Sequence, residues 1–215
     1  GQVAEEVRYD ARPRRAELLM TRIFLTKLPP EIPEHNGGVD LALFALRKVS
    51  GEAQSLVYDA RGKPYVVGGR LFVSISNSRG VCAAAVSDRL VGVDIERRDT
   101  DPEDPRSFLP ERSDGLLVRL AARWFREDET RYVMEAPRTR FPEIWTAKES
   151  YVKMTGDGLS GMTLSPSVLA DTRNVYVRFD DDLVFGCACS PSGVENAQKT
   201  GAEFVEYAEI RSFRK

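Results

Sequence analysis

The chain has 215 residues, of which 42% are hydrophobic and 30% are charged, a balance that is ordinary for a folded globular protein. A formal net charge of −2 argues against a nucleic-acid binder, which would normally carry a basic excess. No apolar run approaches the roughly 18 to 20 residues that span a bilayer, so we expect no membrane contact. The first residues lack the pattern of a secretory signal, and we expect a cytoplasmic protein.

Three cysteines and one histidine narrow the possible chemistry. Cys187 and Cys189 lie in an apolar stretch and, like Cys82, are expected to be small core residues. A zinc site is not predicted, because the sequence has no CxxC pair. His35 lies in a turn-rich segment that we expect to be a loop, which disfavours a hydrolase built on a catalytic histidine. Carboxylates, lysines and a metal ion are the remaining candidates.

In chain order, the first half predicts strands around one helix. Residues 21–28 alternate apolar and polar side chains, which is typical of a strand. Residues 39–49 carry an apolar stripe at helical spacing. Three more short strands, close enough for tight antiparallel connections, are expected at residues 71–76, 80–87 and 90–96. Residues 99–114 begin with an acidic, proline-bearing stretch, so we place the boundary between two units there.

The second half begins with helices and returns to strands. Apolar residues recur every three to four positions over residues 116–125 and 141–155, which predicts two helices. Three Asp residues, 180–182, are interpreted as a solvated turn between two strands. The strands of this half are expected at residues 175–179, 183–189 and 204–210. Each half therefore offers a small antiparallel sheet with helices, which is an α+β fold.

The segment VGVDIE at residues 91–96 places two carboxylates on one face of a strand. Because side chains alternate along a strand, Asp94 and Glu96 share the face opposite Val93 and Ile95. Two neighbouring carboxylates repel each other unless a cation offsets them, and Mg²⁺ is commonly bound by one or two carboxylates together with substrate phosphates. The alternative is a strand whose second face is simply in contact with water, since the D-x-E pattern is common.

The predicted helix 141–155 offers a third carboxylate. Trp145, Glu149 and Lys153 share one stripe of this helix, and Lys148 lies next to Glu149. One interpretation is a surface Glu–Lys pair that contributes a few tenths of a kcal/mol. The other is a carboxylate beside two phosphate-binding lysines.

Two shorter segments offer phosphate contacts. Gly62-Lys63-Pro64 predicts a turn that holds a lysine, and residues 74–78 place hydroxyls and an amide at a strand end. Groups of this kind donate hydrogen bonds to phosphate oxygens. Each segment is equally an ordinary turn.

Together and in this order, the segments resemble the 4'-phosphopantetheinyl transferase superfamily of the surfactin-synthetase-activating (Sfp) type. That family shows G-K-P, F-N-I-S-H-S, (V/I)-G-(V/I)-D-(I/V)-E, W-(S/T)-x-K-E-(A/S)-x-x-K and G-x-G-L. The matching residues here run from Gly62 to Leu159, and the helix motif is followed by Gly156-Asp157-Gly158-Leu159.

The resemblance implies two similar α+β lobes, related by a pseudo-two-fold axis, with the ligand in the cleft between them. Residues 1–98 would form the N-terminal lobe, with the G-K-P turn and the Asp-x-Glu strand. Residues 99–215 would form the C-terminal lobe, with the W-x-x-K-E helix and the closing strands. A monomer would then hold a complete site.

The resemblance also implies an activity: transfer of the phosphopantetheine arm of coenzyme A to a serine of an acyl or peptidyl carrier protein, with release of 3',5'-ADP. Mg²⁺ would be bound by Asp94, Glu96 and Glu149. Glu149 is the candidate general base, directly or through a bound water, and Lys153 the candidate that protects or protonates the leaving group. The residues expected to contact coenzyme A are Lys63, Ser76, Asn77, Lys148, Lys153 and Arg47.

One departure from the family pattern keeps an alternative open. Asn77 replaces the family histidine and carries no charge, so we expect cofactor binding to weaken by about 1–2 kcal/mol. The alternative is a weakened member that binds coenzyme A or a carrier without efficient turnover. A Mg²⁺-dependent pyrophosphohydrolase should carry a denser motif such as E-x-x-E-E, which this sequence lacks. Docking of the carrier is expected near residues 108–116 and 124–127.

Overall fold

The computed structural model describes residues 21–97, 113–171, 174–180 and 183–213. Most of the predicted boundary at 99–114, and two of the three Asp residues of the predicted turn, lie outside these ranges. The helices are α1 (Glu34–Ser50), α2 (Asp114–Trp124), α3 (Glu127–Glu135), α4 (Pro137–Thr155), α5 (Pro191–Thr200) and α6 (Tyr207–Ser212). The strands are β1 (Thr21–Lys27), β2 (Leu56–Tyr58), β3 (Pro64–Val66), β4 (Phe72–Ser78), β5 (Val81–Ser87), β6 (Gly92–Arg97), β7 (Val175–Asp180), β8 (Leu183–Ala188) and β9 (Ala202–Phe204).

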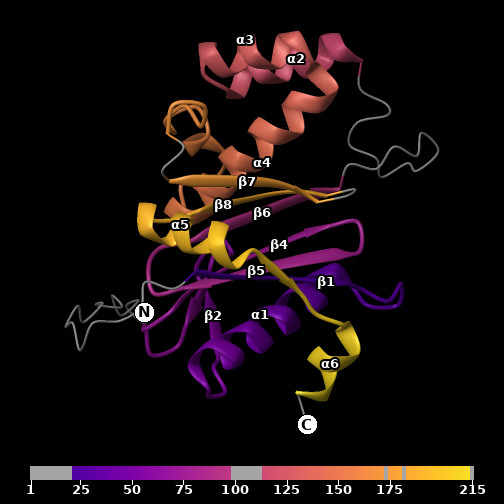
Figure 1. Cartoon of the computed structure of the whole chain (residues 1–215), viewed down its shortest axis with the longest axis vertical. Helices are drawn as coiled ribbons and strands as arrows, with labels where there is room; N and C mark the ends of the chain where they lie inside the picture. The colour runs from indigo at the N-terminus through magenta and orange to yellow at the C-terminus, as the bar shows by residue number, and fades with distance from the viewer. Residues whose placement is uncertain (1–20, 98–112, 172–173, 181–182, 214–215) are drawn as a thin grey trace, which may run out of the picture.

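Two sheets lie face to face between helices, which confirms the predicted α+β class (Figure 1). The first sheet has the order β4-β5-β1-β9 and the second the order β6-β8-β7, while β2 and β3 form a separate hairpin. Alternate residues of β1 and β5 pack against β6 and β8 in a shared core. Their other faces pack on α1, and α4 covers the outer face of the second sheet. The relation of two similar lobes by a pseudo-two-fold axis stays a prediction.

The chain returns to its first sheet at the end. β9 pairs parallel to β1 at the sheet edge, and α6 then packs on α1, where the Tyr207 hydroxyl donates to Asp40 Oδ2 at 2.7 Å. The strand predicted at 204–210 was therefore wrong, because only a short strand ends at Phe204 and a helix follows. Its apolar residues at spacings of two and three suit either structure. The division of the chain at residue 98 stays a prediction.

The start of α1 differs from the sequence prediction. The helix predicted at 39–49 is confirmed, but it begins earlier, so His35 lies in its first turn and the expected loop was wrong. Gly37 and Gly38 resemble helix breakers, yet a Cβ at Gly38 would lie 2.6 Å from Asn77 Oδ1. Gly38 is required by close packing of the helix on β4, and Gly37 by close packing against Leu28, and neither is required by a loop.

The connection from β5 to β6 also differs. A tight antiparallel pairing of these neighbours was predicted, but β6 pairs with β8 in the second sheet instead. Both edges of β5 are already occupied by β4 and β1, so β6 has no free edge of β5 to join. The other predicted strands and helices are confirmed, whereas β2, β3, α3 and α5 were not predicted.

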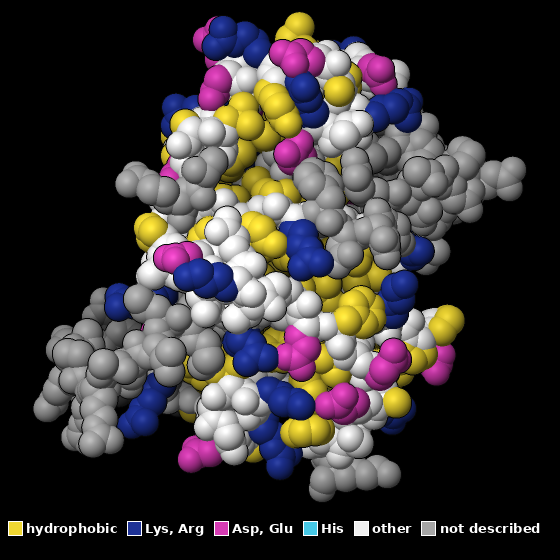
Figure 2. All heavy atoms as spheres, viewed as in Figure 1, with side chains coloured by type: hydrophobic (Ala, Val, Ile, Leu, Met, Phe, Trp, Pro, Cys, Tyr) yellow, Lys and Arg dark blue, Asp and Glu magenta, His cyan; other side chains and the backbone are white. Residues whose placement is uncertain are grey.

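Other general expectations can be compared with the structure. The three cysteines are free and buried, as predicted. No helix within the described ranges is long and apolar enough to cross a membrane. On the face shown in Figure 2, lysine and arginine side chains are interspersed with acidic ones.

Candidate functional site

Helix α4 crosses the second sheet at two glycines. A Cβ at Gly92 of β6 would lie 1.9 Å from the carbonyl oxygen of Ser150, and one at Gly186 of β8 would lie 2.9 Å from that of Thr146. A larger side chain at either position would separate helix and sheet. The glycine of the VGVDIE segment therefore brings the turn that carries Glu149 close to the strand that carries the paired carboxylates.

Asp94, Ser76 and Lys153 form a closely bonded triangle at this crossing. Lys153 Nζ lies 2.6 Å from Asp94 Oδ1 and 2.8 Å from Ser76 Oγ, and the Ser76 hydroxyl donates to the same Asp94 oxygen at 2.8 Å. The Asp94 side chain is 7% exposed and that of Lys153 is 31% exposed. Three segments that are distant in sequence, on β4, β6 and α4, thus meet at one buried carboxylate.

The charge of Asp94 acts on two more carboxylates, those of Glu96 and Glu149. Burial, followed by the charge of Asp94, raises the pKa of Glu96 to about 7. The pKa of Glu149 is raised by the same two causes, while the charge of Lys153 opposes the shift. The three acidic residues therefore form one electrostatic group in which like charges disfavour full ionisation.

The donor set fits a hard divalent cation in part. Asp94 Oδ2 is buried and has no hydrogen-bond partner within the described residues. Crowded carboxylates with raised pKa values and an unpartnered oxygen are what a bound Mg²⁺ would stabilise. As the side chains stand, however, no three potential ligands in the described ranges are close enough together to hold a metal. Lys153 supplies the compensating charge at Asp94 instead.

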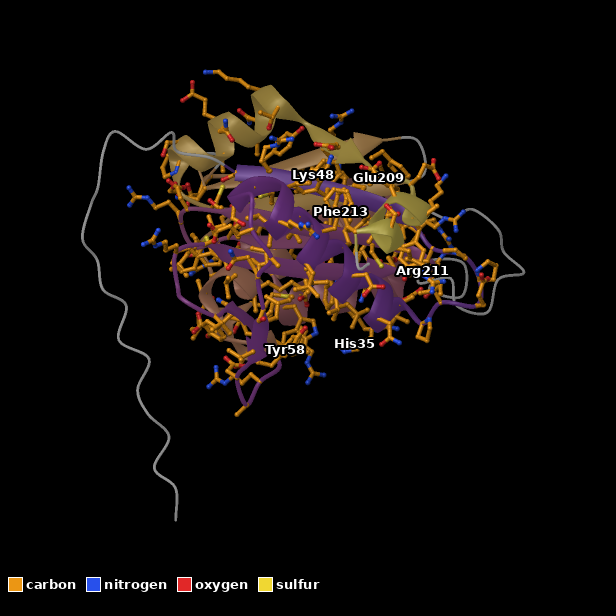
Figure 3. The ribbon with its side chains drawn as sticks, turned by 90° about the horizontal axis from the view of Figure 1, so that it is seen from below. His35, Lys48, Tyr58, Glu209, Arg211 and Phe213 are labelled. Atoms are coloured by element: carbon orange, nitrogen blue, oxygen red, sulfur yellow. The ribbon has the colours of Figure 1, made fainter. Side chains whose placement is uncertain are left out.

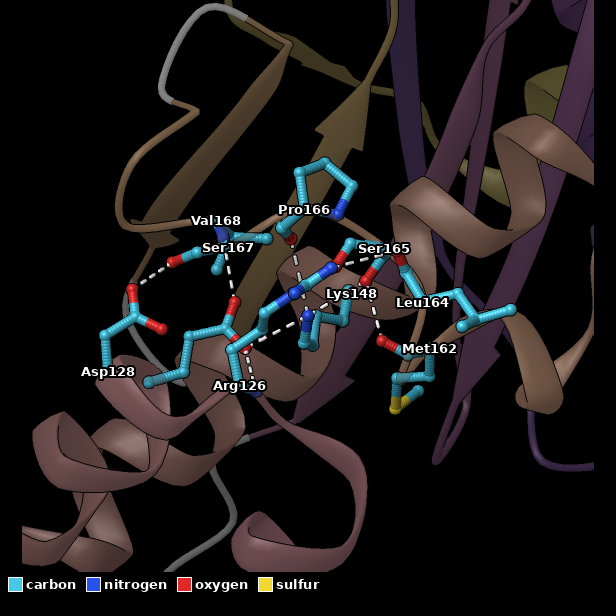
Figure 4. A network of polar contacts seen from close by, with 10 residues as sticks. Arg126, Asp128, Lys148, Met162, Leu164, Ser165, Pro166, Ser167 and Val168 are labelled. Carbon is cyan, nitrogen blue, oxygen red and sulfur yellow. Dashed lines mark hydrogen bonds and ion pairs between the residues drawn. The ribbon is translucent and has the colours of Figure 1, made fainter.

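Lys148 points away from this group. Its side chain is 0% exposed, and its ammonium lies 3.0 Å from Glu129 Oε2 and 2.8 Å from Ser165 Oγ (Figure 4). Glu129 also accepts from the backbone N–H groups of Arg126 and Val168. This arrangement does not support the expected phosphate contact of Lys148. We call this group, Lys148 with Glu129 and residues 164–168, the buried clamp.

Lys63 lies at the C-terminal end of α4. Its ammonium donates to the Met154 carbonyl oxygen at 2.6 Å, and burial lowers its pKa. Arg61 in the same β2–β3 turn donates to the Gly156 carbonyl oxygen at 2.9 Å. Because the last carbonyls of a helix lack partners within it, the turn caps α4. The structure therefore brings Lys63 to the residue next to Lys153.

Asn77 lies on the opposite face of β4 from Ser76, against Gly38 of α1. On the same helix, His35, Asn36 and Val39 line a pocket of about 400 Å³ whose other wall is Tyr58 of β2. Figure 3 shows His35 and Tyr58 together on this side of the molecule. Nothing in the sequence indicates that the start of α1 and the β2–β3 hairpin lie together in space. The sequence analysis therefore did not predict this pocket.

Arg47 lies at the other end of α1. Its guanidinium donates to the Phe213 carbonyl oxygen at 3.0 Å and lies over the Phe213 ring, beside the pair formed by Lys48 and Glu209. The labelled residues of this group are apart from His35 and Tyr58 in Figure 3. The structure thus gives Arg47 a role in fixing the C-terminal helix and does not place it with the other candidate residues.

The predicted docking region for a carrier is only partly described. Phe125 is buried, at 8% exposure, in the core formed by α2, α3 and α4. The Arg126 side chain donates to the carbonyl oxygens of Leu164 and Ser165 in the buried clamp. Residues 108–112 lie outside the described ranges. Of the two aromatic residues expected to receive a carrier, only Trp124 is partly exposed.

Comparison with known proteins decides the family. Residues 90–196, about half of the chain and including both the Asp-x-Glu strand and α4, match the model of the 4'-phosphopantetheinyl transferase superfamily. The chain belongs to this superfamily. This is an enzyme family, and the assignment confirms the resemblance that the sequence motifs indicate.

Two curated relatives carry the same description. The chain is 33% identical to 4'-phosphopantetheinyl transferase HetI of Nostoc sp. strain PCC 7120, over 48% of this chain and 42% of that protein. It is 29% identical to 4'-phosphopantetheinyl transferase psf-1 of Bacillus pumilus, over 57% of this chain and 49% of that protein. In both cases the match covers less than half of the relative's length.

Proposed function

We propose that the protein transfers the 4'-phosphopantetheine arm of coenzyme A to a serine of an acyl or peptidyl carrier protein. The observation that carries this proposal is the electrostatic group of Asp94, Glu96 and Glu149 beside Lys153, within a chain of this superfamily. In the reaction, the serine oxygen forms a bond to the β-phosphorus of coenzyme A. The pyrophosphate bond breaks, 3',5'-ADP leaves, and the serine proton passes to a base.

The carboxylates would hold Mg²⁺, with Asp94 and Glu96 contributed by β6 and Glu149 by α4. The ion supplies charge neutralisation at the pyrophosphate, which is the main requirement of phosphoryl transfer. The unpartnered Oδ2 of Asp94 and the raised pKa values of Glu96 and Glu149 support this set.

Glu149 and Lys153 are proposed to have separate roles at the reacting phosphate. A base works best when its pKa lies near the working pH, and burial together with Asp94 moves the pKa of Glu149 in that direction. We therefore propose Glu149 as the group that accepts the serine proton. Lys153 is the cation beside the carboxylates, and a bound pyrophosphate would compete with Asp94 for its ammonium.

The remaining parts of coenzyme A have candidate contacts nearby. Lys63 contacts the backbone of Met154, the residue after Lys153, and is proposed to bind phosphate after release from this capping bond. The pocket lined by His35, Asn36 and Tyr58 is proposed to hold the nucleotide end, with the exposed Tyr58 ring available for stacking.

A weakened relative that binds coenzyme A or a carrier without turnover is the second candidate. It is favoured by two observations: Asn77 stands where the family has a histidine, and Lys153 pairs with Asp94 while no three potential ligands converge in the described ranges. The two candidates differ in turnover, so a transfer assay separates them.

The test incubates the protein with coenzyme A, Mg²⁺ and several unmodified acyl and peptidyl carriers, and follows carrier mass. The proposal predicts a phosphopantetheine adduct that is abolished by a chelator and by Asp94→Asn. Glu195→Gln changes an exposed acid on α5 and is the matched control, with transfer unchanged. Binding of coenzyme A without an adduct on any carrier would support the second candidate and overturn the first.

A further inference from the structure

The two sheets are joined by serine side chains where no backbone ladder exists. β6 is an edge strand of its sheet. Every second backbone N–H of β6 points away from β8, to the side where no strand pairs with it. The hydroxyl oxygens of β4 accept these N–H groups in register: Ser74 from Val93 at 3.0 Å, Ser76 from Ile95 at 3.3 Å and Ser78 from Arg97 at 3.2 Å. We call these three residues the serine seam.

Two members of the serine seam also hold the carboxylates. The Ser76 hydroxyl donates to Asp94 Oδ1 at 2.8 Å, and the Ser78 hydroxyl donates to Glu96 Oε2 at 3.3 Å. Ser74, which accepts the N–H of Val93, makes no hydrogen bond to an acidic side chain within the described ranges. The seam therefore has a purely structural member and two members that contact the acidic group.

We propose that Ser78 is a positioning residue that fixes the Glu96 carboxylate for metal binding. The inference rests on the proposed function, because it assumes that Glu96 is a ligand. Ser78 is nearly buried, its hydroxyl oxygen accepts the Arg97 N–H, and its proton is donated to Glu96 Oε2. A fixed donor restricts the rotation of the carboxylate and presents its other oxygen in one orientation.

The same geometry gives Ser76 a positioning role at Asp94. Its hydroxyl oxygen accepts from Ile95 N–H and Lys153 and donates to Asp94, so its hydrogen-bonding capacity is fully used. We therefore assign Ser76 to orientation of the carboxylate and not to direct contact with coenzyme A. Ser78 gives the cleaner test, because it does not contact Lys153 in the hydrogen bonds described.

The experiment compares Ser78→Ala with Ser74→Ala. Both variants remove one acceptor of a β6 N–H group and should lower the melting temperature of the metal-free protein by similar amounts. Only Ser78→Ala also releases Glu96. The whole chain is then titrated with Mg²⁺ in the presence of coenzyme A and without any carrier, and binding is followed by calorimetry. This titration measures metal affinity and not turnover.

We expect Ser78→Ala to weaken Mg²⁺ binding by about 10-fold, the usual size for loss of a group that orients a metal ligand. Ser74→Ala should change it by less than about 2-fold, and Ser78→Thr, which keeps the hydroxyl, should restore it. In a Glu96→Gln background, Ser78→Ala should have no further effect, because Ser78 acts through Glu96.

Two results would overturn the inference in distinguishable ways. Equal weakening by Ser74→Ala and Ser78→Ala, with tight binding in the unchanged protein, would show that the seam is structural and would leave the proposed function intact. No Mg²⁺ binding by the unchanged protein beyond that of Asp94→Asn would overturn the metal site itself. If Ser78→Ala fails to fold, the comparison of Ser78→Thr with Ser78→Cys, both close in size, replaces it.

Discussion

Helix α4 carries two lysines with opposite surroundings. Lys148 is fully buried in the buried clamp and faces a carboxylate that is also 0% exposed. Lys153 is 31% exposed and faces Asp94, which belongs to the acidic group at β6. The first lysine holds α3 and residues 164–168 to the helix, whereas the second keeps a partly open position among carboxylates. One helix motif thus supplies one lysine that stabilises the fold and one lysine that lies in the candidate site.

The largest effect should come from breaking the buried clamp. Lys148→Met leaves Glu129 buried without its partner, and we expect a loss of about 3–5 kcal/mol in the free energy of unfolding, measured with urea. Lys153→Met should cost less, because Lys153 itself is 31% exposed and Asp94 keeps its hydrogen bond from Ser76.

A double variant checks that prediction. Lys148→Met with Glu129→Gln removes both charges and keeps an oxygen acceptor for one of the backbone N–H groups that Glu129 serves. It should recover at least half of the lost stability. A double variant no more stable than Lys148→Met alone would contradict the ion-pair explanation of the clamp.

The next effect should come from separating α4 from β6. Gly92→Ala places a Cβ against the Ser150 carbonyl oxygen, and overpacking of this kind costs about 1–3 kcal/mol. The displacement should disturb the acidic group more than the buried clamp. The rate of phosphopantetheine transfer should therefore fall by more than the loss in the free energy of unfolding alone explains. Gly115→Ala on the exposed side of α2 meets only ordinary contacts and is the control, with stability unchanged or raised.

A pH effect should follow from Glu96. Its pKa rises from 4.5 to about 7 on folding, so the folded chain binds the proton more tightly and stability falls as pH rises across that window. In metal-free protein at pH 8, Glu96→Gln should therefore be more stable than the unchanged chain by about 3 kcal/mol, and the two should be equal at pH 4. Thermal melts at both pH values measure this. No advantage at pH 8 would show that Glu96 ionises freely, and an equal advantage at pH 4 would show that the effect does not come from the ionisation of Glu96.

The smallest effect should come from the cap of α4. Lys63→Ala removes the bond to the Met154 carbonyl oxygen and should cost about 1 kcal/mol in urea unfolding. Lys27→Ala, at an exposed strand end, is the control and should cost almost nothing. Equal losses would indicate that the cap contributes no stability. A weaker affinity for coenzyme A in the first variant alone would support the proposed phosphate contact.

Alternation and helical spacing were sufficient to predict most elements before α4 and the pairing of β7 with β8. They did not predict where β6 goes, because its partner depends on which sheet edges are free and not on its own residues. The last strand was misplaced at 204–210 because its apolar spacing suits a short strand followed by a helix equally well. Helices α3 and α5 are short and polar, so they carry too few apolar residues for a helical stripe to be recognised.

The candidate site was predictable to a similar degree. The spacing of Asp94 and Glu96 places them on one face, and the helix motif supplies Glu149 and Lys153 on one stripe. The direction of Lys148 depends on Glu129, which lies on another helix and in no motif. Ser78 was visible as part of an alternating serine pattern, but its role depends on the unpaired edge of β6, which only the three-dimensional arrangement shows.

The most direct test of the division between the two sides of α4 is phosphopantetheine transfer, followed by carrier mass, in two variants. Asp94→Asn disables the acidic group, and Lys148→Met with Glu129→Gln neutralises the buried clamp. We predict that the first variant folds but loses transfer, whereas the second keeps transfer within about tenfold of the unchanged chain. Loss of transfer in a folded clamp variant, or full transfer in Asp94→Asn, would contradict the account.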